Sequence, residues 1–139
     1  MMPNLLSDRE LSIIKGKLSL DHRTEDDWVV VKDLLRDHDI VVMEPMEKNT
    51  KYKIYDHILF DQGGLLVFTS IAESQRYINQ LTAVNGRIMF TVGAMPFLDA
   101  KRISDRRRKD LYIDYKIGVP FIRYRAQHIS ATVMVPKMK

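Results

Sequence analysis

The sequence predicts an α+β domain, in which two N-terminal helices precede a mixed, mostly antiparallel sheet with one or two further helices packed on it. Three observations support this fold class. Residues 7–36 carry helix-start signals and apolar positions at helical spacing. From residue 40 onward, short apolar runs alternate with turn signals, as they do in strands. A helical segment, residues 71–81, interrupts these runs, and no linker or repeat divides the chain, so residues 1–139 are expected to form a single domain.

Two helices are expected first. Ser7 followed three residues later by Glu10 is a capping box, which opens the first helix. Thr24 is a good cap for the second helix, and the three acidic residues after it suit the positive end of the helix dipole. The apolar positions are Leu11, Ile14 and Leu18 in the first helix and Trp28, Val31, Leu34 and Leu35 in the second.

The apolar run 40–43, ended by Pro45, predicts the first strand. Residues 52–60 then alternate with apolar side chains on both faces, which predicts one strand inside a sheet. In such a strand the neighbours Asp56 and His57 point to opposite faces, so they are not expected to act as a pair.

Gly63 and Gly64 predict a hairpin turn before a short buried strand, residues 65–68. Ser70 and Glu73 form a further capping box, and the helix that it opens is expected to end near residues 85–86. The glycines also raise the alternative of a phosphate-binding loop. A hairpin is preferred, because a strand separates the glycines from the helix and both nucleotide-binding fingerprints are absent.

The remaining elements alternate between strands and one helix. Residues 87–92 predict a strand that Gly93 ends, and Pro96 opens a short helix through Ile103. Residues 105–110 lack apolar side chains and predict a solvated turn. Three strands are expected to follow, over residues 111–117, 121–125 and 128–135.

Three passages carry a resemblance to a known family. They are VVMEP at 41–45, GGLLVFTS at 63–70 with the helix after it, and MPFLDAKRIS at 95–104. Over roughly residues 40–105 the chain resembles the N-terminal domain of the SseB family, the serine-sensitivity-enhancing proteins. The resemblance implies a small α+β domain and supplies no catalytic residue.

Composition narrows the function classes. An apolar content of 45% and a charged content of 29% are ordinary for a water-soluble globular protein. The chain has no apolar run of membrane-spanning length, and its start lacks the features of a signal peptide. The absence of cysteine excludes disulfides, thiolate catalysis and cysteine zinc sites. We therefore expect a bacterial cytoplasmic protein without a cofactor.

Residues that could carry catalysis are scattered. The four histidines, at positions 22, 38, 57 and 128, form no metal-binding spacing, so no metal site is expected. Asp61 and Asp99 could pair only through the tertiary fold, and no nucleophile elbow is present. Ser70 is better explained as a helix cap than as a nucleophile. The sequence thus predicts a non-enzymatic module.

Charge is polarised along the chain. Residues 1–50 carry a net charge of −4, residues 51–95 of +1, and residues 96–139 of +7. The basic candidates for binding nucleic acid or an acidic partner are Lys101, Arg102, Arg106, Arg107, Arg108, Lys109, Arg123 and Arg125. The run 101–109 is alternatively a solvated turn that serves solubility. The main expectation is a module that binds a protein partner or self-associates, and nucleic-acid binding through the basic 101–109 turn is the alternative.

Overall fold

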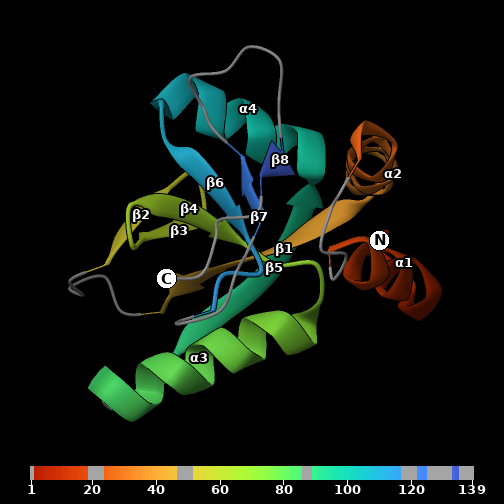
Figure 1. Ribbon diagram of the computed structural model, residues 1–139. Helices are drawn as coiled ribbons and strands as arrows, with labels where there is room; N and C mark the ends of the chain where they lie inside the picture. The colour runs from red at the N-terminus through yellow and green to blue at the C-terminus, as the bar shows by residue number, and fades with distance from the viewer. Residues whose placement is uncertain are drawn as a thin grey trace.

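The computed structural model describes residues 2–18, 24–46, 52–85, 89–116, 122–124 and 133–134. Within them it contains helices α1 (Asp8–Leu18), α2 (Glu25–Arg36), α3 (Ile71–Asn85) and α4 (Phe97–Arg107). The strands are β1 (Asp39–Pro45), β2 (Lys53–Tyr55), β3 (Ile58–Asp61), β4 (Gly64–Val67), β5 (Phe90–Pro96), β6 (Asp110–Ile113), β7 (Ile122–Tyr124) and β8 (Val133–Met134). Two helices come first and strands with further helices follow, so the predicted α+β class is confirmed (Figure 1).

The strands form one larger sheet with a ribbon attached to it. The sheet has the order β2-β3-β4-β6-β7-β8, and only the pairing of β4 with β6 is parallel. The ribbon is the antiparallel pair β1-β5. It joins the sheet through a bridge in which Val41 and Phe68 exchange backbone hydrogen bonds of 2.8 and 2.9 Å. The predicted mixed, mostly antiparallel sheet is therefore present.

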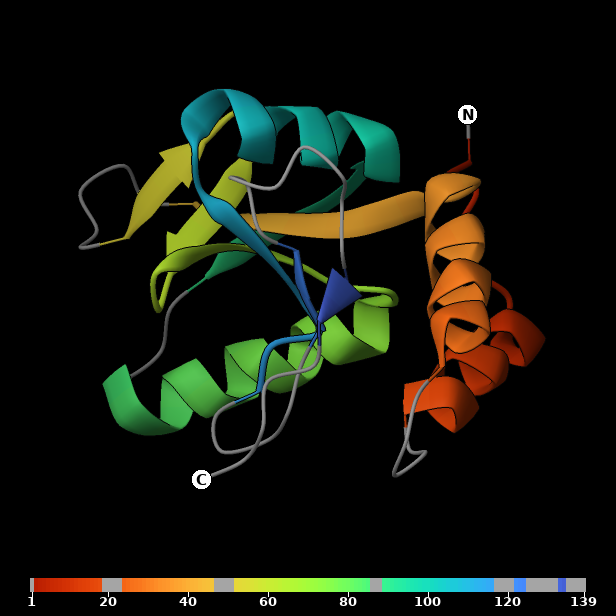
Figure 2. The same ribbon diagram turned by 45° about the horizontal axis from the view of Figure 1, so that its top comes forward.

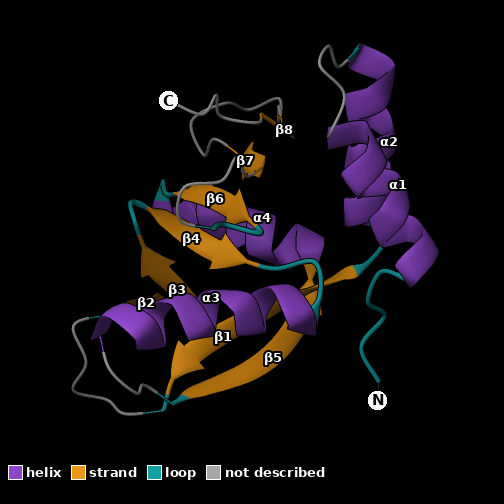
Figure 3. Ribbon diagram, turned by 60° about the horizontal axis from the view of Figure 1, so that its bottom comes forward, coloured by secondary structure: helices purple, strands orange, loops and turns teal. Residues whose placement is uncertain are grey.

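Helices cover both faces of the strands. Helix α4 lies on one face and α3 on the other, while α1 and α2 pack at one side (Figures 2 and 3). Alternate residues of β1 point into two separate hydrophobic cores. Ile40 and Val42 belong to the core shared with α2 and α4. Val41 and Met43 belong to the core under α3. The period of two in a strand thus divides one apolar run between two cores.

The predicted helix caps are present. Ser7 Oγ accepts from the Glu10 N–H at 3.2 Å, and Glu10 Oε1 accepts from the Ser7 N–H at 2.9 Å. Thr24 caps α2 in the same reciprocal way, with Asp27 as its partner. Ser70 Oγ accepts from the Glu73 N–H at 3.2 Å at the start of α3, but this capping box is only half formed, because the Glu73 carboxylate faces Arg76 and Lys116 instead of the Ser70 N–H. Local capping chemistry therefore sets three of the helix starts.

The prediction of one strand over residues 52–60 is wrong. The chain reverses at Asp56 and His57, whose φ angles are 49° and 71°, and Tyr55 pairs with Ile58 across this turn. A two-residue turn with both φ angles positive suits a hairpin, and Asp tolerates that conformation. The turn exchanges the two faces, so that Ile54 packs on the core under α3 and Ile58 belongs to the core shared with α4. Because both faces are apolar, this exchange leaves no break in the sequence pattern.

The prediction that Gly93 ends a strand is also wrong. Strand β5 continues from Phe90 to Pro96, with Gly93 in its middle opposite Val42. Pairing with β1 holds the backbone extended on both sides of the glycine, which overrides its weak strand propensity.

The solvated turn predicted at residues 105–110 is wrong over most of its length. Helix α4 continues to Arg107, Arg108 ends it in the left-handed conformation with φ 54°, and Asp110 already belongs to β6. The polar residues 105–107 form the exposed last turn of an amphipathic helix, so their lack of apolar side chains does not break it.

The strand predicted over residues 111–117 ends early. Strand β6 stops at Ile113, and Asp114 adopts a φ of 57°. Most of the strands predicted at 121–125 and 128–135 lies outside the described residues, which include only 122–124 and 133–134 of them.

Gly64→Ala should destabilise the fold. A Cβ at Gly64 would lie 2.7 Å from ring atoms of Tyr112, a buried side chain on the neighbouring strand. We expect a loss of about 1–3 kcal/mol in the free energy of unfolding, because the ring must shift within a packed layer. Gly93→Ala is the matched control, since its Cβ would meet no atom within 4 Å. Urea unfolding of both variants tests this, and equal stabilities would contradict it.

Candidate functional site

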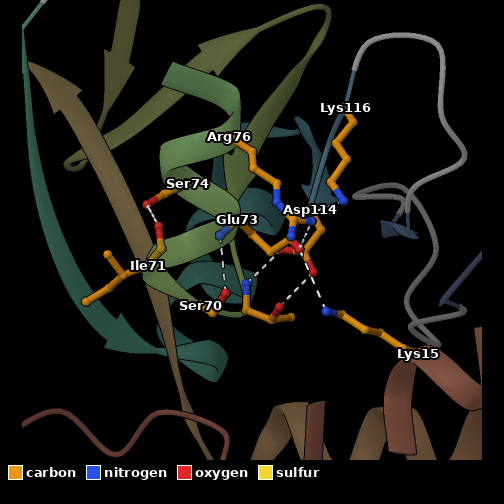
Figure 4. Close-up of polar contacts among 9 residues, drawn as sticks. Lys15, Ser70, Ile71, Glu73, Ser74, Arg76, Asp114 and Lys116 are labelled. Carbon is orange, nitrogen blue, oxygen red and sulfur yellow. Dashed lines mark hydrogen bonds and ion pairs between the residues drawn. The ribbon is translucent and has the colours of Figure 1, made fainter. Parts of the chain in front are cut away.

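A polar cluster lies where the parallel strands β4 and β6 end and α3 begins. Thr69 follows β4. Asp114 follows β6, and Glu73 lies in the first turn of α3 (Figure 4). In sheets with parallel strands, functional side chains gather at the carboxyl ends of those strands. This cluster is therefore the first place where convergent chemistry would be expected.

Glu73 is the centre of the cluster. Only 4% of its surface is exposed, yet cations from three parts of the chain reach it. Its Oε1 lies 3.0 Å from Arg76 Nη1 and 4.0 Å from Lys15 Nζ of α1. Its Oε2 has no hydrogen bond within the described residues, although Lys116 Nζ forms an ion pair with it at 3.0 Å. The carboxylate thus links α1, α3 and the segment after β6.

Asp114 is held beside Glu73. Thr69 donates to it twice, from its N–H at 2.8 Å and from its Oγ1 at 2.7 Å. Burial raises the pKa of Asp114 to about 6, although the two bonds from Thr69 oppose this rise. A positive φ at a non-glycine residue and a partly buried acid with a raised pKa are both features of functional sites.

The contacts of Asp114 and Glu73 also give both carboxylates a structural role. Both oxygens of Asp114 accept from Thr69, and both oxygens of Glu73 face cations. In the described part of the chain, no group of three or more His, Cys, Asp or Glu side chains could hold a metal ion. These ion pairs and hydrogen bonds connect α1, the start of α3 and the ends of β4 and β6.

Several of the basic residues predicted as a site have an acidic or aromatic partner. Arg106 and Arg107 of α4 both bind Asp56 in the β2–β3 turn, with shortest N···O distances of 2.8 and 3.2 Å. Hydrogen bonds from Arg107 and then Arg106 lower the pKa of Asp56. Lys109 Nζ lies 5.2 Å from the centre of the Phe60 ring. These cations hold the end of α4 over the β2–β3 hairpin.

The other predicted cations have local partners as well. Arg102 pairs with Asp99 at 3.1 Å, and Arg123 with Asp110 at 2.6 Å. Lys101 Nζ lies 5.4 Å from the Tyr124 ring centre, and exposed Arg108 is the C-cap of α4. Arg125 lies outside the described residues. Sequence reasoning missed these acidic partners because most of them are distant in the chain.

The histidines that the structure describes stay apart, as the sequence suggested. His38 Nε2 lies 3.0 Å from Glu10 Oε2, and its Nδ1 lies 2.6 Å from the Leu34 carbonyl oxygen. His57, at the β2–β3 turn, lies 3.2 Å from Glu44. The histidines at positions 22 and 128 lie outside the described residues.

Strand β5 presents an open edge. Within the described residues it pairs with β1 alone, and Figure 3 shows it at the margin of the strands. Residues 91–94 are exposed, including Val92 at 39%. Met89 and Met46, which are joined by a backbone hydrogen bond of 2.9 Å, add exposed apolar surface at one end. Sequence reasoning missed this edge, although the uncharged run 88–98 is a usable signal for it.

The register shows which backbone groups of β5 are open. Val41 exchanges hydrogen bonds with Phe68, so the β1 residues on either side of it direct theirs toward β5. Successive residues of a strand alternate in this direction. The N–H and C=O groups of Phe90, Val92 and Ala94 therefore point away from β1, toward the open side.

No protein-family model matches the chain, and no curated protein or solved structure matches it either. None of the helices in the described residues is both long enough and apolar enough to cross a membrane.

Proposed function

We propose that this chain is a non-enzymatic, SseB-like module that self-associates through the open edge of β5. The supporting observation is an exposed strand of seven residues with no charged side chain. Natural edge strands are normally kept short or protected by charge. Strand β2, one of the two edges of the larger sheet, follows that rule with three residues and an exposed lysine at position 53, whereas β5 does not.

The open groups of β5 define a symmetric pairing. If two copies of β5 run antiparallel with Val92 opposite its equivalent, Phe90 faces Ala94 of the other copy and Ala94 faces Phe90. Each facing pair exchanges two backbone hydrogen bonds, about six in all. Pro96, which has no N–H to donate, falls outside this register. A two-fold axis through Val92 thus uses every open N–H group of Phe90, Val92 and Ala94.

The charge pattern favours a second copy of this chain as the partner of the β5 edge. The run 88–98 contains no charged side chain, so two identical edges meet without like-charge repulsion. At about 1 kcal/mol net for each hydrogen bond, the pairing contributes an energy similar to the cost of association. We therefore expect a weak, concentration-dependent dimer.

Sedimentation over a concentration series tests the proposal. The native protein should shift from monomer to dimer, and Val92→Lys should weaken the dimer at least about tenfold because it places two lysines opposite each other. Val29→Lys is the matched control: Val29 is an exposed valine on α2, away from β5, and the variant adds the same charge. A native protein that stays monomeric at high concentration, or a control that weakens the dimer equally, would refute the proposal.

Nucleic-acid binding through residues 101–109 is the alternative. It is favoured by the exposure of the basic side chains, 63% for Arg106 and 75% for Arg102. The carboxylates beside these residues reduce the charge that they can offer to phosphates. Changing residues 106–109 to Ser should abolish salt-dependent retention on DNA or RNA if this function is correct, and should leave the β5 dimer intact.

The proposal also includes a non-enzymatic role and a location in the cytoplasm. The occupied oxygens of Asp114 and Glu73 support a non-enzymatic role, because they leave no evident acceptor for a substrate proton. A chain without cysteine suits the reducing cytoplasm of a bacterium, which is the compartment that we propose.

A further inference from the structure

A hollow of about 150 Å³ lies between α2 and α4. Its apolar floor is formed by Leu35 of α2, Phe97 of α4 and Tyr124 of β7, all three buried. The rings of Phe97 and Tyr124 meet edge to face, with centres 6.2 Å apart and planes at 76°. A cavity of about this volume holds one benzene-sized ring.

Cations surround the hollow. Lys32 and Arg36 lie one helical turn apart on α2, and Lys101 faces them from α4. Among the described residues no carboxylate lines the hollow, although Arg36 is paired outside it with Asp33 at 2.9 Å. Lys32 has no ion-pair partner among the residues that the structure describes. Lys101 lies over the Tyr124 ring, so its ammonium group stands directly beside the apolar floor.

We propose that this hollow binds a small organic anion, with an aromatic ring on the floor and a carboxylate among the three cations. Burial of a ring alone gives little affinity in so shallow a site. The three cations, which have no acid among the described lining residues, add attraction for a negatively charged group of the ligand. The volume suits a free single-ring molecule, which is why an aryl carboxylate is the proposed class. Binding is independent of the β5 edge.

Titration with benzoate, followed by NMR of the backbone amides, tests the proposal. We expect saturable shifts at residues 35, 98 and 101, and weaker binding as salt is raised. Benzyl alcohol, which has the ring without the charge, should bind several-fold more weakly. Equal shifts from the two compounds, or no shift with benzoate at millimolar concentration, would overturn the proposal.

Two variants and one control test the charge and the shape of the hollow separately. Lys32→Gln should weaken benzoate binding roughly threefold or more, because it removes a cation from the rim. Lys53→Gln, which removes an exposed lysine from β2, should leave binding unchanged. Leu98→Trp should abolish binding by filling the hollow, since Leu98 lines it and is 38% exposed. Full binding by Leu98→Trp would place the ligand elsewhere and refute the site.

Discussion

Mixing the Val92→Lys protein with the Val92→Glu protein should restore the dimer that each variant has lost alone. In the proposed register Val92 lies on the two-fold axis and faces its equivalent. Each single variant therefore opposes two like charges, whereas the mixture opposes Lys to Glu, and opposite charges across a strand pair are stabilising. We expect the mixed dimer to form at least about tenfold more tightly than either variant with itself. Sedimentation of the separate and mixed samples measures this difference.

The same experiment tests the register. Thr91 is also exposed on β5 but does not face its own equivalent when the axis passes through Val92. Mixing Thr91→Lys with Thr91→Glu should therefore give a smaller recovery. A larger recovery at Thr91 would show that the strands pair in another register, and no recovery at either position would show that β5 does not pair with itself. Neither substitution touches the buried core, so the monomer should stay folded.

Asp114→Asn should stabilise the fold by ~2 kcal/mol at neutral pH. Burial raises the pKa of Asp114 to about 6 from its ordinary value of 3.8, so the folded state resists ionisation more than the unfolded state does. The stability that this difference contributes is complete below pH ~4 and is lost as the pH rises through about 6. Asn cannot ionise and accepts the positive φ of this position. The variant should therefore gain most at pH 7 and little at pH 4.

Urea unfolding between pH 4 and pH 8 checks the prediction. Asp114→Ala is the control, because it also removes the charge but leaves the Thr69 N–H and Oγ1 without their acceptor. Ala is also strained at positive φ, so this variant should be destabilised by about 1–3 kcal/mol at pH 4 and by less at pH 7, where removal of the charge offsets part of the loss. A loss of stability by Asp114→Asn at neutral pH would contradict the prediction. It would mean that the hydrogen bonds from Thr69 and the attraction to Lys116 stabilise the ionised carboxylate by more free energy than its burial costs.

Much of the fold could be predicted from the sequence because it depends on neighbours in the chain. A cap residue and its partner are three positions apart, as Ser7 and Glu10 are, so their bond forms before any tertiary packing. The turn at Gly63, where φ is 86°, has a similar local cause. The apolar spacing of α2 also predicted which of its residues, Val31 and Leu35, are buried.

The candidate sites could be predicted much less well, because each depends on residues far apart in the chain. The eight predicted cations were read as one patch, yet carboxylates such as Asp56 and Asp110 pair with several of them. The alternation predicts Asp114 as a strand residue, and its two hydrogen bonds with Thr69, 45 positions earlier, follow only from the tertiary fold.

By itself the sequence determined the α+β class, the three capped helix starts and the hairpin before β4, since period and capping act over a few residues. Only the tertiary structure decided that residues 52–60 fold back at Asp56, that β5 runs through Gly93 and ends the ribbon, and that α4 continues to Arg107. In each case pairing or packing with a distant segment outweighs a local preference of about 1 kcal/mol or less. The uncharged run 88–98 suits an edge strand, but whether a second strand pairs with it depends on the whole fold, because that partner would come from a distant part of the chain.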